Sequence, residues 1–180
     1  MLPFSIPIFP LPTVVLFPNV FLPLHIFEPR YRQMVTEALA GDRIIGMVLL
    51  QPGYENDYEG RPPIYPTGCS GLITHSDRLD DGRFNLVLQG IEKFTVHTEE
   101  QAAPGRLYRS AVITPIEESV PAHERDELRS QRQRLEAALA PLLTSGLERS
   151  LPPAMPDEDL VNALAQYLDF APLEKLALLE

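Results

Sequence analysis

The chain has 180 residues, of which 44% are hydrophobic and 22% charged, a composition typical of one globular domain with at most a small appendage. Its formal net charge of −10 disfavours nucleic acid as a partner, because phosphate backbones are normally bound by a basic face. The single cysteine, Cys69, excludes an intrachain disulfide and a cysteine-based metal site, and we expect it to be an inert buried thiol. The N-terminus lacks a basic region, and prolines interrupt its apolar residues. We therefore expect a cytoplasmic protein with neither a signal peptide nor a membrane span.

The first elements are short apolar runs separated by prolines. Ser5–Pro12 predicts a strand, which we expect to be very short or at a sheet edge because proline cannot donate to a ladder. Val14–Phe17 follows, and the turn pair Pro18-Asn19 closes it. Val20–Phe27 predicts a second strand, in which alternation favours the core for both phenylalanines.

A helix is predicted next, over residues 29–40. Pro29 suits its first position, apolar residues recur at helical spacing from Tyr31 to Leu39, and Gly41 supplies a stop. Arg43–Leu50 then predicts a strand that is buried on both faces. Gln51–Pro66 is a polar loop, long enough to suggest mobility or a binding role.

The middle of the chain predicts a hairpin. Gly68–His75 is its first strand, and Asp80-Asp81-Gly82 is the turn. The returning strand begins at Phe84, and Gly90 interrupts it, which indicates a bulge or a barrel corner. Lys93–His97 continues the strand, and Leu107–Ile116 predicts the last one.

The pattern becomes helical after about Pro121. His123–Leu143 has a leucine stripe opposite arginines and glutamates, and we expect Pro141 to end or kink this helix. After a linker, Asp157 is predicted to cap a second helix, and Pro172 opens a third that reaches the last residues.

Two blocks of sequence resemble one known family. The segment IPIFPLPTVVLFPNVFLPLHIFEPRYRQMV resembles the opening of the Lon protease N-terminal (substrate-binding) domain family. The block from Gly68 to Ile73, the turn at 80–83 and the run LVLQGIEKF (residues 86–94) are similar to that family's hairpin. The resemblance covers about residues 5–118, and the helical tail is similar in kind.

The resemblance implies an α+β fold: a PUA-like twisted, partly closed β-barrel with one inserted helix, followed by a C-terminal helical bundle. We expect residues 1–118 to form the barrel domain and residues 119–180 a helical subdomain. The sequence has no G-x-x-x-x-G-K-[ST] phosphate loop and nothing that corresponds to the family's serine–lysine peptidase. We therefore expect a stand-alone, non-catalytic module, without a cofactor, that binds unfolded or extended polypeptide segments or a partner protein.

The candidate binding residues lie in or beside the predicted loops and the start of the first helix. They are Phe17, Pro18, Glu28, Arg30, Tyr31 and Tyr54. For Phe17 and Tyr54 the sequence leaves open whether the ring is in the core or lines a groove. Glu28 and Arg30, with His25, could instead form an acid–base group. The simpler interpretation is that Glu28 caps the helix or forms an ion pair with Arg30 or Arg32.

Metal sites and other functions have weaker support. The four histidines show no i, i+4 spacing, and Asp77, Asp80 and Asp81 fit a plain turn better than a calcium loop. An RNA- or nucleotide-binding role stays open because PUA-like barrels of other families bind RNA, although the acidic charge argues against it. A peptidase is the weakest alternative, since no nucleophile and base can be paired.

Overall fold

The computed structural model describes residues 2–54, 60–101, 103–117, 125–143 and 156–180. Contacts along the chain divide it into two compact units. One unit comprises Met1–Ile116 together with Asn162–Glu180, and the other comprises Glu117–Val161. The C-terminal residues thus group with the sheet, while the expected division at residue 118 remains a prediction about independently folding domains.

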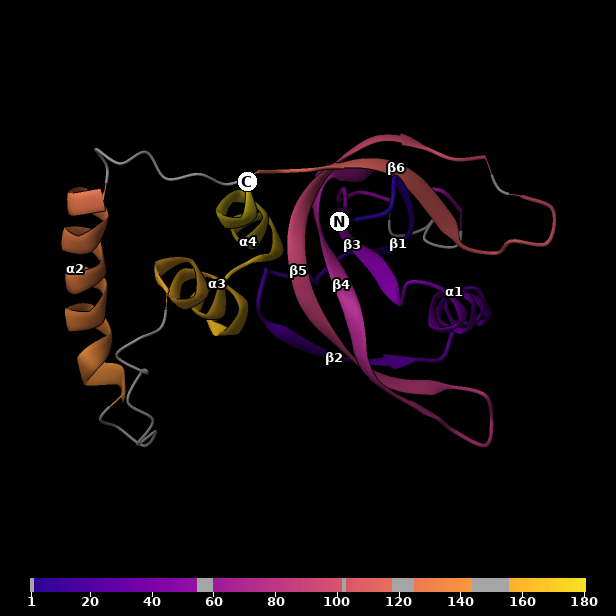
Figure 1. Ribbon diagram of the computed structural model, residues 1–180, viewed down its shortest axis with the longest axis horizontal. Helices are drawn as coiled ribbons and strands as arrows, with labels where there is room; N and C mark the ends of the chain where they lie inside the picture. Colours follow the sequence, from indigo (N-terminus) through magenta and orange to yellow (C-terminus); the bar gives the residue numbers. More distant parts are fainter. Residues whose placement is uncertain (1, 55–59, 102, 118–124, 144–155) are drawn as a thin grey trace. The chain divides into compact units, whose positions relative to one another are not determined.

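The larger unit is built on a mixed sheet of six strands. The strands are β1 (Ser5–Leu11), β2 (Phe21–Ile26), β3 (Ile44–Leu50), β4 (Ile64–Arg78), β5 (Phe84–Glu99) and β6 (Arg109–Pro115). Their order is β2-β5-β4-β3-β1-β6, and β5 also pairs with β6. β1 and β3 run parallel, and the other pairs are antiparallel. Figure 1 shows β4 and β5 as two long strands that curve together.

The expectation that the first strand is very short or at an edge is wrong, because β1 has seven residues and lies between β3 and β6. The register explains how its prolines are tolerated. β1 pairs with β6 along Ser5–Ile8 and with β3 along Ile8–Leu11. Each proline therefore lies in a stretch with one neighbour in register, which is locally an edge, where a missing N–H is tolerated.

The predicted hairpin is confirmed. The Gly82 N–H donates to the Leu79 carbonyl at 2.9 Å, and Gly82 has a φ of 80°, which favours glycine. β5 is one strand of sixteen residues, with a register shift opposite Ser70 and Gly71 that confirms the bulge near Gly90. A Cβ at Gly90 would overlap the Phe17 carbonyl, so this glycine also lets the 17–18 turn approach the sheet.

The first helix forms as predicted, as α1 (Pro29–Ala40). Its buried side chains, from Tyr31 to Ala38, pack into the main core, and the rings of Phe9 and Tyr31 lie 4.2 Å apart. β3 is buried along almost its whole length, as expected. The polar loop after it is shorter than predicted, since β4 begins at Ile64 rather than after Pro66.

The C-terminal residues complete the core of the larger unit. α3 spans Asp157–Tyr167, and α4 spans Pro172–Leu179. Leu176 and Leu179 belong to the main core cluster, and the side chain of Gln166 accepts the Phe17 N–H at 3.2 Å. Apolar packing and this hydrogen bond therefore both hold the C-terminal residues against the β-rich part.

The smaller unit contains α2 (Arg125–Leu143), which ends just past Pro141. Arg132 on this helix pairs with Glu136 at 2.8 Å and with Asp157 at 2.5 Å. Asp157 is the first residue of α3 rather than the capping residue before it, and it begins an acidic first turn that complements the helix dipole. No helix in the part of the chain that the structure describes is long and apolar enough to cross a membrane.

Candidate functional site

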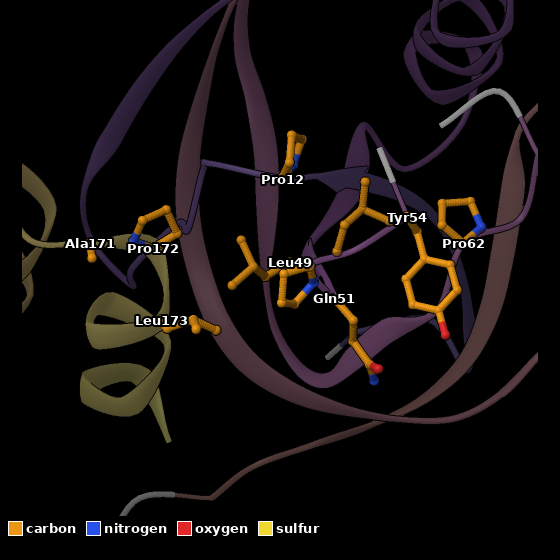
Figure 2. A pocket seen from close by; sticks show the side chains of 10 residues that line it. Pro12, Leu49, Gln51, Tyr54, Pro62, Ala171, Pro172 and Leu173 are labelled. Atoms are coloured by element: carbon orange, nitrogen blue, oxygen red, sulfur yellow. The ribbon is translucent and has the colours of Figure 1, made fainter. Parts of the chain in front are cut away.

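The larger unit contains an open apolar groove of about 580 Å³, which we call the apolar groove. Figure 2 shows its side chains, with Tyr54 and Pro62 across from Ala171, Pro172 and Leu173. Its lining consists of Pro12, Leu49, Leu50, Gln51, Pro52, Tyr54, Pro62, Ala171, Pro172 and Leu173. A volume of this size, with a mostly apolar lining and few polar groups, is typical of a ligand site.

Three parts of the chain build the groove. The end of β3 places the buried Leu49 and Leu50 at its base, and the following turn carries Tyr54. The start of α4 brings Pro172 and Leu173 to the other side, since Leu176 and Leu179 anchor that helix in the core. The groove is therefore attached to rigid elements on both sides.

Few of the residues that line the groove offer a ligand an unsatisfied hydrogen-bonding group. Four of the lining residues are prolines, which have no backbone N–H to be left unsatisfied. The Gln51 N–H donates to the Pro63 carbonyl at 2.9 Å, and its side-chain amide donates to the Ile64 carbonyl at 3.1 Å. Tyr54 and Leu173 remain about half exposed, so the rim presents apolar surface to solvent.

A second, smaller hollow of about 180 Å³ carries charge, and we call it the arginine hollow. Four arginines line it, together with Pro10, Tyr31, Gly60, Leu107 and Tyr108. The four are Arg30, Arg61, Arg106 and Arg109. None of the described lining residues is acidic, whereas the whole chain has a net charge of −10.

Glutamates outside the lining hold these arginines in place. Glu99 pairs with Arg109 at 2.5 Å and with Arg61 at 3.1 Å. Burial alone would raise the pKa of Glu99, but hydrogen bonds and charge from the two arginines outweigh it and leave the pKa below its ordinary value. Glu99 therefore stays ionised and orients both guanidinium groups.

The other two arginines are held in the same way. Arg30 pairs with Glu28 at 2.9 Å, and its guanidinium lies 4.6 Å from the centre of the Tyr31 ring. Arg106 pairs with Glu100 at 3.6 Å and donates to the Ser110 hydroxyl at 3.2 Å. Each arginine of the hollow thus has at least one carboxylate partner.

Tyr108 forms part of the same wall. Its hydroxyl donates to a carboxylate oxygen of Glu37 at 2.6 Å. Burial, followed by the Glu37 hydrogen bond and charge, raises the pKa of Tyr108 to about 12. The phenol therefore remains a neutral donor near neutral pH.

The six residues predicted from the sequence do not lie at one site. Tyr54 lies on the rim of the apolar groove, while Arg30 and Tyr31 line the arginine hollow. Glu28 forms the ion pair with Arg30 that the simpler interpretation favoured. Phe17 and Pro18 are buried, so neither ring offers a surface to a ligand.

The exposure of Phe21 and Phe27 is the reverse of what alternation indicated, and Phe17, for which the sequence left both positions open, lies in the core. Phe17 is only 1% exposed and belongs to the main core, whereas Phe21 is 50% and Phe27 is 60% exposed. The prediction that Phe21 and Phe27 are core residues is therefore wrong. β2 lies at one end of the strand order and pairs along its length with β5. The face of β2 that carries Phe21 is exposed to solvent.

Several groove residues were not predicted from the sequence. Leu49 was predicted to be buried, and Pro172 was noticed as a helix start, but nothing linked them. In the sequence, the prolines near Pro52 and Pro62 indicated a loop. That pattern did not indicate that they form an apolar wall of a groove.

The remaining candidates keep structural roles. Cys69 is buried, as expected, and the Asp81 carboxylate accepts the Arg83 N–H within the hairpin turn at 3.0 Å. The His25 ring contacts the Asn85 side chain at 2.7 Å. The described residues contain no group of His, Cys, Asp or Glu that could hold a metal ion.

The fold is that of a Lon N-terminal domain. A Lon N-terminal domain protein from Xanthomonas campestris superposes with a TM-score of 0.65 and 21% identity, over 98% of this chain and 89% of that one. The N-terminal domain of the Lon protease of the Mycobacterium avium complex gives a TM-score of 0.65 and 16% identity, over 98% and 90% of the two chains.

The chain belongs to the ATP-dependent protease La (LON) substrate-binding domain family, whose model matches residues 5–180. The Lon protease of Dictyoglomus thermophilum is 29% identical over 164 residues, which are 91% of this chain and 19% of that protein. The Lon protease of Flavobacterium johnsoniae is 31% identical over 67% of this chain and 14% of its own length. The chain thus spans less than a fifth of these relatives.

Proposed function

We propose that this chain is a non-catalytic module that binds extended or unfolded polypeptide segments, and that the apolar groove is where they bind. The observation that carries the proposal is an open groove of about 580 Å³ with apolar walls on ordered elements. Membership of the substrate-binding domain family of Lon supports the same class of ligand.

The groove suits such a ligand physically. Tyr54 and Leu173 are partly exposed on opposite sides, so an apolar side chain placed between them buries their surface and its own. Proline walls neither donate hydrogen bonds nor demand them, so different sequences can bind. Such a groove selects polypeptides by their apolar content more than by their exact sequence. A module for unfolded chains requires this kind of selection.

We also propose the finer features of the fold and setting. The pairing of β5 with β4, β2 and β6 supports a twisted, partly closed barrel of the PUA-like type. In this proposal residues 119–180 form a helical subdomain, of which residues 162–180 pack with the sheet. The protein is cytoplasmic and binds its ligands without a cofactor.

The alternative of RNA or nucleotide binding has less support. Its strongest candidate surface is the arginine hollow, but all four arginines are paired with glutamates. A polyphosphate backbone requires several positive charges that are not already neutralised. We therefore keep polypeptide binding as the proposed function.

Fluorescence anisotropy with a labelled, permanently unfolded polypeptide tests the proposal. We expect binding by the wild-type chain and at least tenfold weaker binding by Leu173→Asp, since a charge in the groove loses the apolar contact and must be desolvated. The matched control is Leu178→Asp. Leu178 is on the same helix and is also 50% exposed, but does not line the groove.

The control separates site from fold. Leu178→Asp should bind like the wild type, because the substitution leaves the groove unchanged. Equal loss in both variants, or no binding by the wild type to any unfolded polypeptide, would contradict the proposal.

A further inference from the structure

The two hollows are neighbours, joined at Pro62. Pro62 lines the apolar groove, and its carbonyl accepts a hydrogen bond from Arg109 Nη1 at 2.9 Å. A small cavity of about 10 Å³ is lined by residues of both, with Leu50 and Pro62 from the groove and Arg30 and Arg109 from the hollow. A ligand in the groove therefore lies beside an arginine-lined surface.

More arginines line the hollow than there are glutamates that form ion pairs with them. Four arginines face it, and the glutamates that pair with them are three: Glu28, Glu99 and Glu100. The fourth nearby glutamate, Glu37, is bonded to Tyr108 and lines a different hollow. Among the described residues that line the arginine hollow, the charge is entirely positive.

Two of the arginines have donors to offer. Among the described residues, Arg61 makes both of its hydrogen bonds through Nη2. Arg106 makes its side-chain hydrogen bond and its ion pair through Nη1, and its guanidinium lies 5.3 Å from the centre of the Tyr108 ring. A guanidinium has five N–H donors in a rigid fork that matches a carboxylate. Since glutamates already fix the positions of Arg61 and Arg106, a new carboxylate would find preorganised donors.

The hollow also has an exposed apolar residue in its lining. Leu107 lines it and is exposed, and its N–H is held by the Gln33 side chain at 2.9 Å. The arginines thus have apolar neighbours both at Pro62 and at Leu107. This arrangement suits an acidic residue inside a peptide, with chain on both sides, better than a terminal carboxylate.

We propose that the polypeptide segments bound in the apolar groove carry an acidic side chain next to their apolar residue, and that the arginine hollow binds its carboxylate. This inference rests on the proposed function, and it adds a preference among substrates. Charged hydrogen bonds of this kind are strong enough to give about a tenfold difference in affinity.

Matched peptides test the inference. Each has one large apolar residue and an amidated C-terminus, and Glu, Gln or Lys is placed in turn at successive neighbouring positions. With the wild-type chain, we expect the best Glu peptide to bind about tenfold tighter than its Gln counterpart and the Lys peptide to bind weakest, with the Glu preference decreasing as salt rises.

Variants locate the effect. The double variant Arg61→Gln, Arg106→Gln should lose the preference for Glu over Gln while still binding the Gln peptide, because both arginines are partly exposed and the groove is untouched. Arg83→Gln is the control, since Arg83 is comparably exposed and pairs with Asp81 in the hairpin turn. It should keep the preference.

The outcomes distinguish the two proposals. If Glu and Gln peptides bind equally well to the wild type, the acidic preference is wrong while polypeptide binding stands. If a Gln peptide binds tenfold tighter only when its C-terminus is a free carboxylate, the hollow binds the carboxylate at the end of a chain. The assignment of the hollow to an internal acidic side chain is then wrong. If no peptide binds, the proposed function itself fails.

Discussion

Replacing Phe17 and Phe21 separately by alanine tests the burial pattern at the start of the chain. Phe17 is 1% exposed and lies in the main core, so Phe17→Ala loses the transfer free energy of the ring and leaves a cavity. We expect the free energy of unfolding to fall by about 3–5 kcal/mol. That is a large part of the roughly 5–15 kcal/mol typical of a domain.

Phe21→Ala is the matched substitution four positions later. Its ring is already 50% exposed, so about half of the transfer free energy of a phenylalanine is at stake, or about 1 kcal/mol. Urea unfolding followed by circular dichroism measures both, and the midpoints should shift without a change in slope. Equal losses, or a larger loss for Phe21→Ala, would refute the burial that the structure gives these two rings.

Three further predictions concern contacts outside the groove. Gly90→Ala should lower the free energy of unfolding by about 1–3 kcal/mol in urea titrations, because the new Cβ overlaps the Phe17 carbonyl; an unchanged midpoint would contradict that close approach. Tyr108 should titrate near pH 12 by tyrosinate absorbance, and Glu37→Gln should bring its pKa down, unless the carboxylate has no part in the shift. Glu99 has a lowered pKa in the folded state, so its stabilising contribution is complete above its ordinary pKa of 4.5 and is lost as the pH falls through the folded value. Acid unfolding of Glu99→Gln should therefore be less steep than that of the wild type, and identical curves would count against the ion pairs.

Local sequence signals predicted an element well where the backbone preference of single residues determines it. Pro29 and Gly41 bound the first helix, and Asp81-Gly82 forms the hairpin turn, because each depends on the backbone preferences of the residue itself. Gly90 also marked the bulge, although the structure explains this glycine by the close approach of the Phe17 carbonyl. The family resemblance then gave the fold, which the solved structures and the family model support.

Properties that depend on distant partners were not predictable from the sequence. β1 lies inside the sheet because β6 pairs with its first part and β3 with its last part. The prolines of β1 alone do not reveal this arrangement. Phe17 is buried because the turn after it closes over Gly90 in β5. In both cases tertiary packing overrides a local preference.

The groove illustrates the same limit. Its lining comes from segments near residues 12, 50, 62 and 172, which meet because α4 packs on the core. Tyr54 was a candidate on its own, but Leu173 had no signal beyond a helical pattern. The arginines of the hollow are likewise spread from residue 30 to residue 109.

NMR mapping of a bound apolar peptide tests the central claim most directly. On titration into the labelled chain, the methyl resonances of Leu49, Leu50 and Leu173 should shift first and together, since all three line the groove. The exposed rings of Phe21 and Tyr167, which do not line it, should be unaffected. Saturable shifts at Phe21 and Tyr167 with none at Leu49 and Leu173 would place the peptide elsewhere and contradict the account.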